Sequence, residues 1–435
     1  MLKRLLSLLL CAVLLTGCMP NFTTDSLLSP PKLTPDQSKL FSALEAAIGS
    51  NNFKLKYPRR GEYLSAFILE DIDDNDVPEA IAFYELTVAG ATSTWMSILV
   101  QDEAGEWRSA VQVPGPHSEI DFVRFAPITQ LERKNIIVGW SASKREDMQA
   151  SVYLFTGNQV ATMFTEVYDE LLTTDVDRNG LHELLLFTKN YIKPAAIRLA
   201  RFGASRVSIV SEVNLPTSTV GFANVGYGAL STGLNGVFAD VNLDNGMITT
   251  IIATIDRSNL TELFAEDFGL QTSFERRPPS MSIGDINNDG YLDLPQNELL
   301  PGYGGQSDLD KLYLTKFYSI VEGSLIPTTY AIVNHKAGYM LKVPPAWEGT
   351  VTVLPQADTN EWRFVIYEGS LAASELELLK IKAVSPGDYV DKFDTTNYRT
   401  IATKGSTKYL AYIPDESYDQ LSISYEDLQK LFALL

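Results

Sequence analysis

The sequence predicts a mainly β fold, a β-propeller of about five four-stranded blades followed by a small C-terminal α+β domain. Three observations lead to this prediction. Short apolar strands recur with a period of about 50 residues. In several of these units, an acidic loop directly follows the first strand. After residue 334 the acidic loops stop, and the chain closes on an amphipathic helical segment.

Residues 1–17 have the pattern of a signal peptide. Met1-Leu-Lys-Arg is basic, and the apolar stretch from Leu5 to Leu15 is too short to cross a bilayer. The stretch ends in Leu15-Thr-Gly-Cys18, which resembles a bacterial lipobox. The resemblance implies cleavage before Cys18, a lipid on its thiol, and a membrane anchor on the extracytoplasmic side of the bacterial cell envelope. The alternative is an ordinary signal peptide with an incidental cysteine.

Residues 18–33 contain Pro20, Pro30 and Pro31 without apolar periodicity, which indicates a flexible tether. Residues 34–62 are expected to form an N-terminal helix and a lead-in to the first blade. Thr34 is a good N-cap, Pro35 suits the first helical position, and Gly49 can end the helix.

Residues 63–334 repeat one plan: an apolar strand, a loop, a second apolar strand and a hairpin. The first unit has strands at 66–69 and 80–83 and hairpin arms at 95–100 and 107–112. A unit without an acidic loop is expected at 122–164, where the spacing between acidic loops doubles. The pattern leaves open whether the units close into a ring or form an arc.

Three loops carry oxygen-bearing side chains at positions 1, 3, 5 and 9, between apolar strands. Calcium takes six to eight oxygen ligands, and the backbone carbonyl at position 7 can add one. A β-branched residue at position 2 can pack beneath each loop. A weaker fourth copy has isoleucine at position 9. The predicted calcium ligands are Asp71, Asp73, Asn75, Val77 and Glu79, then Asp175, Asp177, Asn179, Leu181 and Glu183, then Asp285, Asn287, Asp289, Tyr291 and Asp293, with Asp240, Asn242 and Asp244 as the weaker set.

These loops resemble the calcium loops of FG-GAP and VCBS repeats, which form integrin-α-like propellers. The resemblance covers about residues 63–334 and implies structural Ca²⁺ and a platform that binds protein or glycan partners. An EF-hand is excluded, because it needs flanking helices and a glutamate at position 12. The alternative for each loop is a polar turn whose Asp and Asn side chains cap their own backbone.

No arrangement of residues typical of a catalytic site stands out, so the sequence favours a lipid-anchored binding or scaffolding protein over an enzyme. A propeller hydrolase that uses carboxylates in a central channel, like a glycosidase, is the alternative. A third possibility is a structural propeller whose C-terminal domain does the work. The formal charge of −19 argues against a nucleic-acid partner. The five tryptophans are expected to pack between blades or in the C-terminal core, and stacking on sugars is the alternative.

Residues 335–435 are expected to form the α+β domain. Apolar strands are predicted at 339–343, 350–353, 362–366, 378–382 and 409–412. Ser424 to Phe432 is expected to be a closing helix, with Ser424 and Asp427 at its N-terminus as a capping box.

Overall fold

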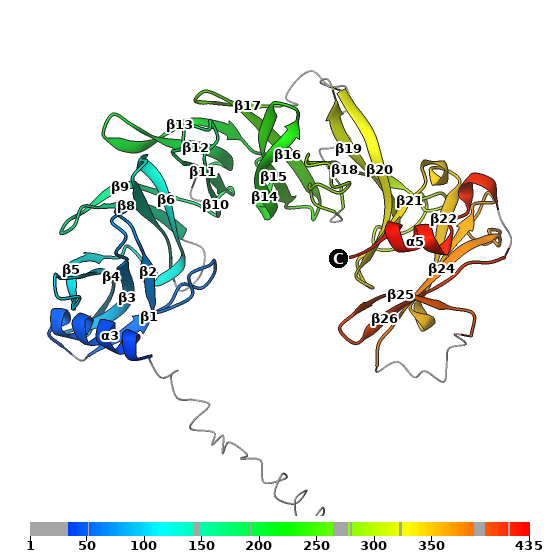
Figure 1. Cartoon of the computed structure of the whole chain (residues 1–435). Helices are drawn as coiled ribbons and strands as arrows, with labels where there is room; N and C mark the ends of the chain where they lie inside the picture. Colours follow the sequence, from blue (N-terminus) through cyan, green and yellow to red (C-terminus); the bar gives the residue numbers. More distant parts are fainter. Residues whose placement is uncertain are drawn as a thin grey trace, which may run out of the picture.

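The computed structural model describes residues 34–50, 52–142, 148–191, 193–263, 277–278, 281–321, 324–386, 396–415 and 418–435. The predicted lipidation site Cys18 and the predicted tether lie outside these residues. The described chain is mainly β, as predicted, and forms six antiparallel sheets of four or five strands. The sheets follow one another along an open arc (Figure 1).

The first sheet is covered by helix α3 (Pro35–Ile48). Thr34 Oγ1 accepts a hydrogen bond from Gln37 N at 3.3 Å, and Gly49 ends the helix with φ 68°, as the sequence predicts. Leu40 and Leu44 are buried in the same core as this sheet. The sheet contains β1 (Phe53–Lys56), β2 (Phe67–Glu70), β3 (Glu79–Val88), β4 (Ala91–Gln101) and β5 (Trp107–Pro114), with β1 and β2 sharing one edge of β3.

The next three sheets each use four consecutive strands in sequence order. In the third and fourth sheets the first strands, β10 and β14, lie toward the inside of the arc, and the last strands, β13 and β17, lie toward the outside (Figure 1). The strands are β6 (Glu119–Gln130), β7 (Arg133–Ser141), β8 (Met148–Phe155), β9 (Val160–Val167), β10 (Glu170–Thr174), β11 (Glu183–Thr188), β12 (Ala196–Gly203), β13 (Arg206–Asn214), β14 (Thr219–Ser231), β15 (Leu234–Leu243), β16 (Ile248–Asp256) and β17 (Asn259–Glu262).

The fifth sheet continues across the expected domain boundary at 334/335, because β20 pairs with β21 and β21 pairs with β27 near the C-terminus. One buried core then joins the fifth and sixth sheets. The fifth sheet contains β18 (Leu294–Leu299), β19 (Tyr313–Val321), β20 (Ser324–Asn334), β21 (Tyr339–Val343) and β27 (Phe432–Leu434), and the sixth contains β22 (Val351–Gln356), β23 (Glu361–Ile366), β24 (Glu377–Val384), β25 (Arg399–Lys404) and β26 (Thr407–Tyr412).

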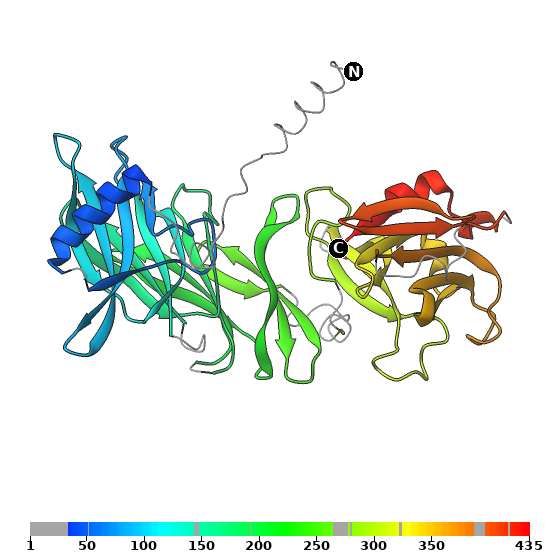
Figure 2. The ribbon, with the colours of Figure 1, turned by 90° about the horizontal axis from the view of Figure 1, so that it is seen from below.

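The closing helix α5 (Tyr425–Leu431) starts where the sequence predicts it. Ser424 Oγ accepts a hydrogen bond from Asp427 N at 3.1 Å, and Leu428 is fully buried. The helix ends one residue earlier than expected, since Phe432 begins β27. Figure 2 shows α3 at one end of the arc and α5 near the other.

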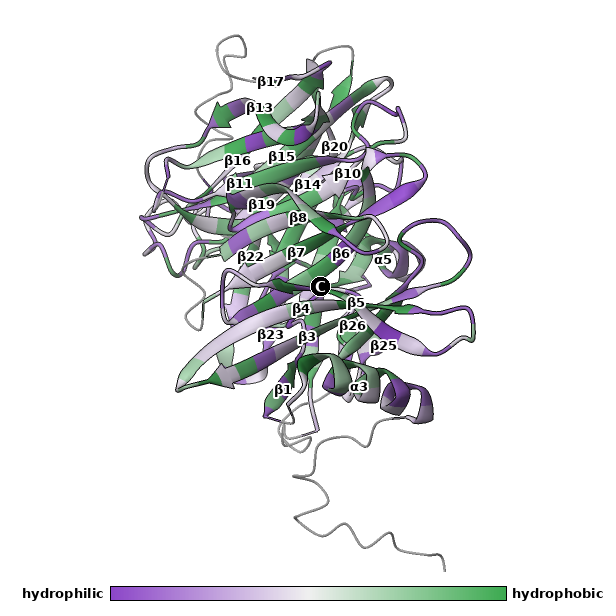
Figure 3. Ribbon diagram, turned by 90° about the vertical axis from the view of Figure 1, so that its left-hand side faces the viewer, coloured by the Kyte–Doolittle hydropathy of each residue, from purple (hydrophilic) through white to green (hydrophobic). Residues whose placement is uncertain are grey.

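Aromatic residues fill the spaces between neighbouring sheets. Phe83 on β3 meets Trp140 on β7 edge-to-face, with ring centroids 5.7 Å apart. Phe187 on β11 meets Phe222 on β14 at 5.9 Å. In Figure 3 the hydrophobic stretches follow the strands through the stack of sheets. Burial of this apolar surface, at about 25 cal/mol per Å², is the main force that holds each sheet on the next.

Candidate metal centres

The three predicted calcium loops share one backbone geometry. In each, the carboxylate at position 1 accepts hydrogen bonds from the backbone N–H groups of positions 5 and 6, at 2.8–3.1 Å. Position 6 has a positive φ in all three loops, at 66° for Asp76, 88° for Gly180 and 87° for Gly290. Glycine suits this conformation in the second and third loops, whereas Asp76 adopts it at a steric cost.

The acid at position 9 joins the two ends of each loop, because its carboxylate accepts a hydrogen bond from the backbone N–H at position 2. Glu79 accepts a hydrogen bond from Ile72 N at 2.9 Å, and Glu183 accepts one from Val176 N at 3.0 Å. Asp293 accepts the equivalent bond from Ile286 N at 3.0 Å. The strand pairing at the base of each loop is also the same: the residue before position 1 is the β-sheet partner of the residue at position 9. The spacing read from the sequence therefore fixes the fold of all three loops.

In the first loop three acids converge. Ligand oxygens of Asp71, Asp73 and Glu79 lie within 4.8 Å of one another. Burial and the neighbouring carboxylates raise the pKa of Glu79 above its usual range, although its hydrogen bond from Ile72 opposes the shift. Asp73 Oδ1 is buried and has no hydrogen-bond partner among the described residues. Clustered carboxylates with an unpartnered oxygen fit a divalent cation that prefers oxygen ligands.

The second loop brings Asp175, Asp177 and Glu183 equally close. Here Arg201 on β12 donates to Asp177 at 3.0 Å and to Glu183 at 2.8 Å. Burial is the largest cause of a raised pKa for Glu183, and the Arg201 guanidinium works against it. An arginine from a neighbouring strand is therefore paired with two acids of this loop, whereas Arg133 approaches the first loop only through Asp73, at 4.0 Å.

The third loop places its acids differently. Asp293 is fully buried, and its Oδ1 accepts hydrogen bonds from Ser319 at 2.5 Å and Thr328 at 3.3 Å. Within the described part of the chain, Asp285, Asp289 and Asp293 do not form a convergent cluster like those of the first two loops. In this loop, neutral hydroxyls therefore donate hydrogen bonds to the position-9 acid. The side chains that could hold a cation are those of Asp285, Asn287 and Asp289.

The prediction of a fourth calcium loop at Asp240, Asn242 and Asp244 is wrong. Residues 234–243 form strand β15, so Asp240 and Asn242 lie in a strand and not in a loop, and only Asp244 lies in the turn that follows. Asp240 is fully buried and pairs with Arg277, with Nη2 and Oδ1 2.7 Å apart. Alternate residues of a strand share one face, so a 1-3-5 pattern of polar residues is compatible with a strand as well as with a loop. The carboxylate of Asp240 is already neutralised by an arginine.

The second sheet, which has no acidic loop, replaces the position-9 acid with a neutral amide that sequence reasoning missed. Asn135 is fully buried, and its Oδ1 accepts hydrogen bonds from Ile128 N at 3.1 Å and from both N and Oγ1 of Thr129 at 3.0 Å. Its Nδ2 donates to Tyr153 O at 3.2 Å. The seven-residue separation of Ile128 and Asn135 equals that of Ile72 and Glu79, which is the signal that could have identified it.

The first two loops also bond to the next sheet. Ile72 O accepts a hydrogen bond from Lys134 N in β7 at 2.8 Å. Val176 O accepts one from Tyr227 Oη in β14 at 3.1 Å. At position 2, the backbone N–H thus bonds to the position-9 acid of its own loop, and the backbone carbonyl bonds to the neighbouring sheet. A change in loop structure would be transmitted to the contact between sheets.

The carboxylates of Asp121 on β6 and Glu170 on β10 bear on the hydrolase alternative, because they lie on first strands of neighbouring sheets. Arg60 bridges them, with Nε 2.8 Å from Asp121 and Nη1 3.0 Å from Glu170. Tyr168 Oη also donates to Asp121 at 2.8 Å, and burial raises the pKa of Tyr168 strongly. Both carboxylates are tied to an arginine, so this pair is a structural ion-pair network.

Comparisons with known proteins give no family. No protein-family model matches the chain, and no curated protein matches it. Among solved structures, the exotype rhamnogalacturonan lyase YesX is 9% identical with a TM-score of 0.31, covering 74% of this chain and 83% of its own. The periplasmic gluconolactonase PpgL of Pseudomonas aeruginosa is 11% identical with a TM-score of 0.28, covering 74% and 86%. The Bacillus licheniformis rhamnogalacturonan lyase PL11 is 9% identical with a TM-score of 0.30, covering 83% and 90%.

Similarities at these TM-scores carry no inference about activity. Within the described residues, no helix has the length and hydrophobicity needed to cross a bilayer.

Proposed function

We propose that the chain is a calcium-stabilised binding or scaffolding module of the bacterial cell envelope. In this proposal the arc of antiparallel sheets is an integrin-α-like propeller of about five blades, with the C-terminal sheet packed at its end. Its partner is an extracellular protein or glycan. The observation that carries the proposal is the recurrence of one loop geometry in three sheets, with convergent acids in two of them.

In the first two loops calcium would be held by the side chains at positions 1, 3, 5 and 9, and in the third by those at positions 1, 3 and 5. The position-7 carbonyl would be a further ligand in each loop. When bound, the ion supplies positive charge that offsets the repulsion between the clustered carboxylates, of which only Glu79 and Glu183 are buried. The loops that would hold it lie at the joints between sheets, where Ile72 and Val176 bond to the next sheet. Calcium would therefore stabilise the relative placement of neighbouring sheets, which suits a rigid platform for a partner.

The anchor in this proposal is a lipid on Cys18, joined to the first sheet by residues 18–33. Such a tether would hold the platform close to the membrane and leave it free to reorient. Metabolic labelling with an alkyne fatty acid tests the anchor: the full-length protein is expected to be labelled and a Cys18→Ser variant is not. Equal labelling of both would remove the lipid from the proposal.

Thermal unfolding with EGTA or with millimolar Ca²⁺ tests the metal. The double variant Asp71→Asn, Asp175→Asn should lose most of the calcium response, because each substitution removes a ligand charge. Asp102→Asn is the matched control, since Asp102 caps an ordinary hairpin turn by accepting from Ala104 N and Glu106 N at 2.9 Å. A calcium response that is absent in the wild type, or equal in both variants, would contradict the proposal.

Binding is tested by pull-down from envelope extracts. A partner is expected to be retained in Ca²⁺, lost in EGTA, lost with the double variant and kept by Asp102→Asn. Failure to retain any partner in either condition would count against the binding role, even if the calcium response is present.

A further inference from the structure

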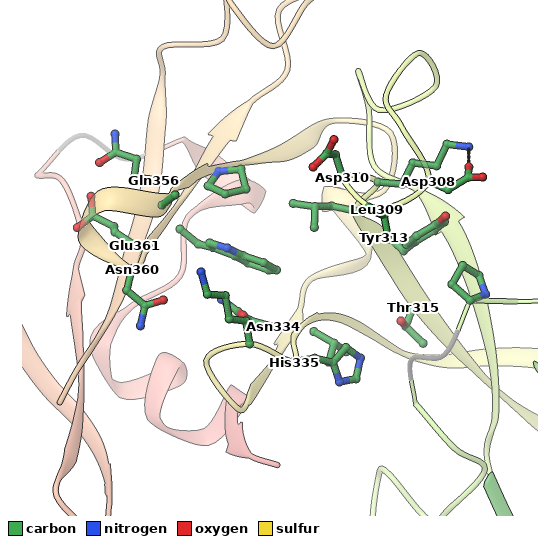
Figure 4. A pocket seen from close by; sticks show the side chains of 18 residues that line it. Asp308, Leu309, Asp310, Tyr313, Thr315, Asn334, His335, Gln356, Asn360 and Glu361 are labelled. Carbon is green, nitrogen blue, oxygen red and sulfur yellow. Dashed lines mark hydrogen bonds and ion pairs between the residues drawn. The ribbon is translucent and has the colours of Figure 1, made fainter. Parts of the chain in front are cut away.

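A cleft opens between the fifth and sixth sheets (Figure 4). Its volume is about 490 Å³, and no predicted calcium ligand lines it. Three segments far apart in the sequence form its walls: the loop at 308–313, the turn at 333–336 between β20 and β21, and residues 355–362 around the turn between β22 and β23. Pockets of about 300–1,000 Å³ are typical of small-molecule sites.

One wall of the cleft is aromatic. Trp362 lines it and is partly exposed, whereas Trp140 and Trp347 are buried at 0% and 1% exposure. The Trp362 indole stands edge-to-face on the buried Tyr339, with ring centroids 6.1 Å apart and planes at 70°. Pro355 is paired with Trp362 across β22 and β23 and also lines the cleft. The core therefore fixes the indole at the wall, and an apolar surface is presented to whatever enters.

The polar groups around this surface are mostly amides and paired charges. Gln356 and Asn360 are exposed on one side of the cleft, and His335 lies on another (Figure 4). Partial desolvation lowers the pKa of His335, so its imidazole is neutral at pH 7 and can both donate and accept. The carboxylate of Asp308 pairs with Lys311 at 2.7 Å, and that of Glu361 pairs with Lys382 at 3.2 Å. Asp310 and Lys336 also line the cleft, and no ion pair among the described residues holds either of them. Counted with Lys382, the three acids and three lysines around the cleft balance in charge, so the cleft carries no net charge that would favour an ionic ligand.

We propose that this cleft binds a neutral oligosaccharide. A sugar ring has an apolar C–H face, which suits stacking on Trp362, and hydroxyls at its rim, which suit the amide of Gln356 and the Oδ1 of Asn360. The Nδ2 of Asn360 already donates to Ala383 O at 3.2 Å. A second hollow of about 540 Å³ adjoins the first along residues 308–313, which gives room for several sugar rings in a row. The inference rests on the proposed binding role and deepens it, because it commits to a glycan partner and to its location.

Isothermal titration calorimetry on the chain without its first 18 residues tests the proposal, since that chain keeps every described residue. The probes are cellotetraose, xylotetraose, maltotetraose and N-acetylchitotetraose, with tetragalacturonate as the anionic arm and an unstructured peptide of mixed sequence as the protein arm. Trp362→Leu is compared with Trp107→Leu, which removes another partly exposed tryptophan, on β5 of the first sheet. Gln356→Ala is compared with Gln130→Ala, an exposed glutamine at the end of β6.

At least one neutral tetrasaccharide is expected to bind, and Trp362→Leu should weaken it by about tenfold or more, which corresponds to the loss of one stacked ring. Gln356→Ala should weaken it by about threefold, the scale of one neutral hydrogen bond, and it cannot unfold the chain because Gln356 is exposed. Both control variants should bind like the wild type. No heat with any neutral sugar, equal affinity in Trp362→Leu and Trp107→Leu, or binding of only tetragalacturonate or the peptide would overturn the proposal.

The calcium response of unfolding is measured on the same samples. Sugar binding without a calcium response would support the proposed sugar site in the cleft and contradict the proposed calcium-stabilised scaffold. A calcium response without sugar binding would do the reverse.

Discussion

Replacing Glu79 with glutamine is expected to leave the calcium-free protein almost unchanged in stability and to remove most of the calcium stabilisation of the first loop. Glu79 is 4% exposed, and its carboxylate accepts the hydrogen bond from Ile72 N. A hydrogen bond to a charged group contributes about 1.5–3 kcal/mol and a neutral one about 0.5–1.5 kcal/mol, so the change costs about 1 kcal/mol. Removing a buried charge beside Asp71 and Asp73 offsets a cost of that size.

In calcium the two proteins should differ. Extracellular calcium modules bind with dissociation constants of about 0.1–1 mM, so about 10 mM Ca²⁺ stabilises an intact site by about 1.4–2.7 kcal/mol. Glutamine keeps an oxygen but loses the charge, which weakens the site. Glu79→Ala separates the roles, since it leaves Ile72 N unsatisfied and should cost about 1–3 kcal/mol in both conditions.

The assay is urea unfolding followed by tryptophan fluorescence, in EGTA and in Ca²⁺, for wild type, Glu79→Gln and Glu79→Ala. An unchanged calcium increment in Glu79→Gln would refute the ligand role of Glu79. A loss in EGTA as large for glutamine as for alanine would refute the claim that a neutral oxygen suffices to close the loop.

The pH dependence follows from the same residue. Burial first, and then the neighbouring aspartates, raise the pKa of Glu79 above its ordinary value. The charged form is therefore disfavoured in the fold, and its cost is fully present above the raised pKa. As pH falls through the raised pKa toward the unfolded value of about 4.3, that cost disappears. In EGTA, the free energy of unfolding of the wild type relative to that of Glu79→Gln should therefore increase as the pH is lowered from 7 toward 4.5.

Three further substitutions, each in a strand, test the roles assigned to Asn135, Arg201 and Asp240 by the same urea assay. Asn135→Asp places a negative charge where the structure has a neutral amide, so it should cost at least about 1–3 kcal/mol at pH 7 and less at pH 5; an equal cost at both pH values would contradict this. Arg201→Met removes the arginine between Asp177 and Glu183, so it should lower stability in EGTA by about 3 kcal/mol and increase the calcium increment; an unchanged increment would show that Arg201 and calcium do not compete. Asp240→Asn breaks a buried ion pair and should cost about 3–5 kcal/mol equally with and without calcium, whereas a calcium-dependent loss would restore Asp240 as a ligand.

The strands and three of the loops follow from local pattern. Apolar runs place β3, β4 and β5 where the sequence predicts strands, at 80–83, 95–100 and 107–112. The loops at Asp71, Asp175 and Asp285 form because a short-range hydrogen-bond network, from position 1 to positions 5 and 6, is written into consecutive residues. Local interactions of this kind need no knowledge of the rest of the fold.

The remainder depends on residues that are distant in sequence. Whether Asp240 lies in a loop or a strand is decided by its pairing with β14 and β16 and by Arg277, 37 residues away. The Arg201 bridge and the cleft at Trp362 likewise need strands to be placed side by side. Asn135 does not follow from the sequence for another reason: a pattern of acids does not include an asparagine, whereas the fold at that position requires an oxygen acceptor that is either charged or neutral.

The comparison of Asn135 with Glu79 and Glu183 argues that closing the loop and binding a metal are separable tasks. All three side chains accept from a backbone N–H seven residues earlier, so that hydrogen bond is what the fold requires. A carboxylate in that place carries the added cost of a buried charge, which an amide avoids. In sheets that have the acid, an interaction with a positive charge is therefore expected to offset this cost. In the second loop Arg201 supplies part of that charge, and in the first loop the described residues supply no comparable cation, which makes the first loop the strongest candidate for calcium.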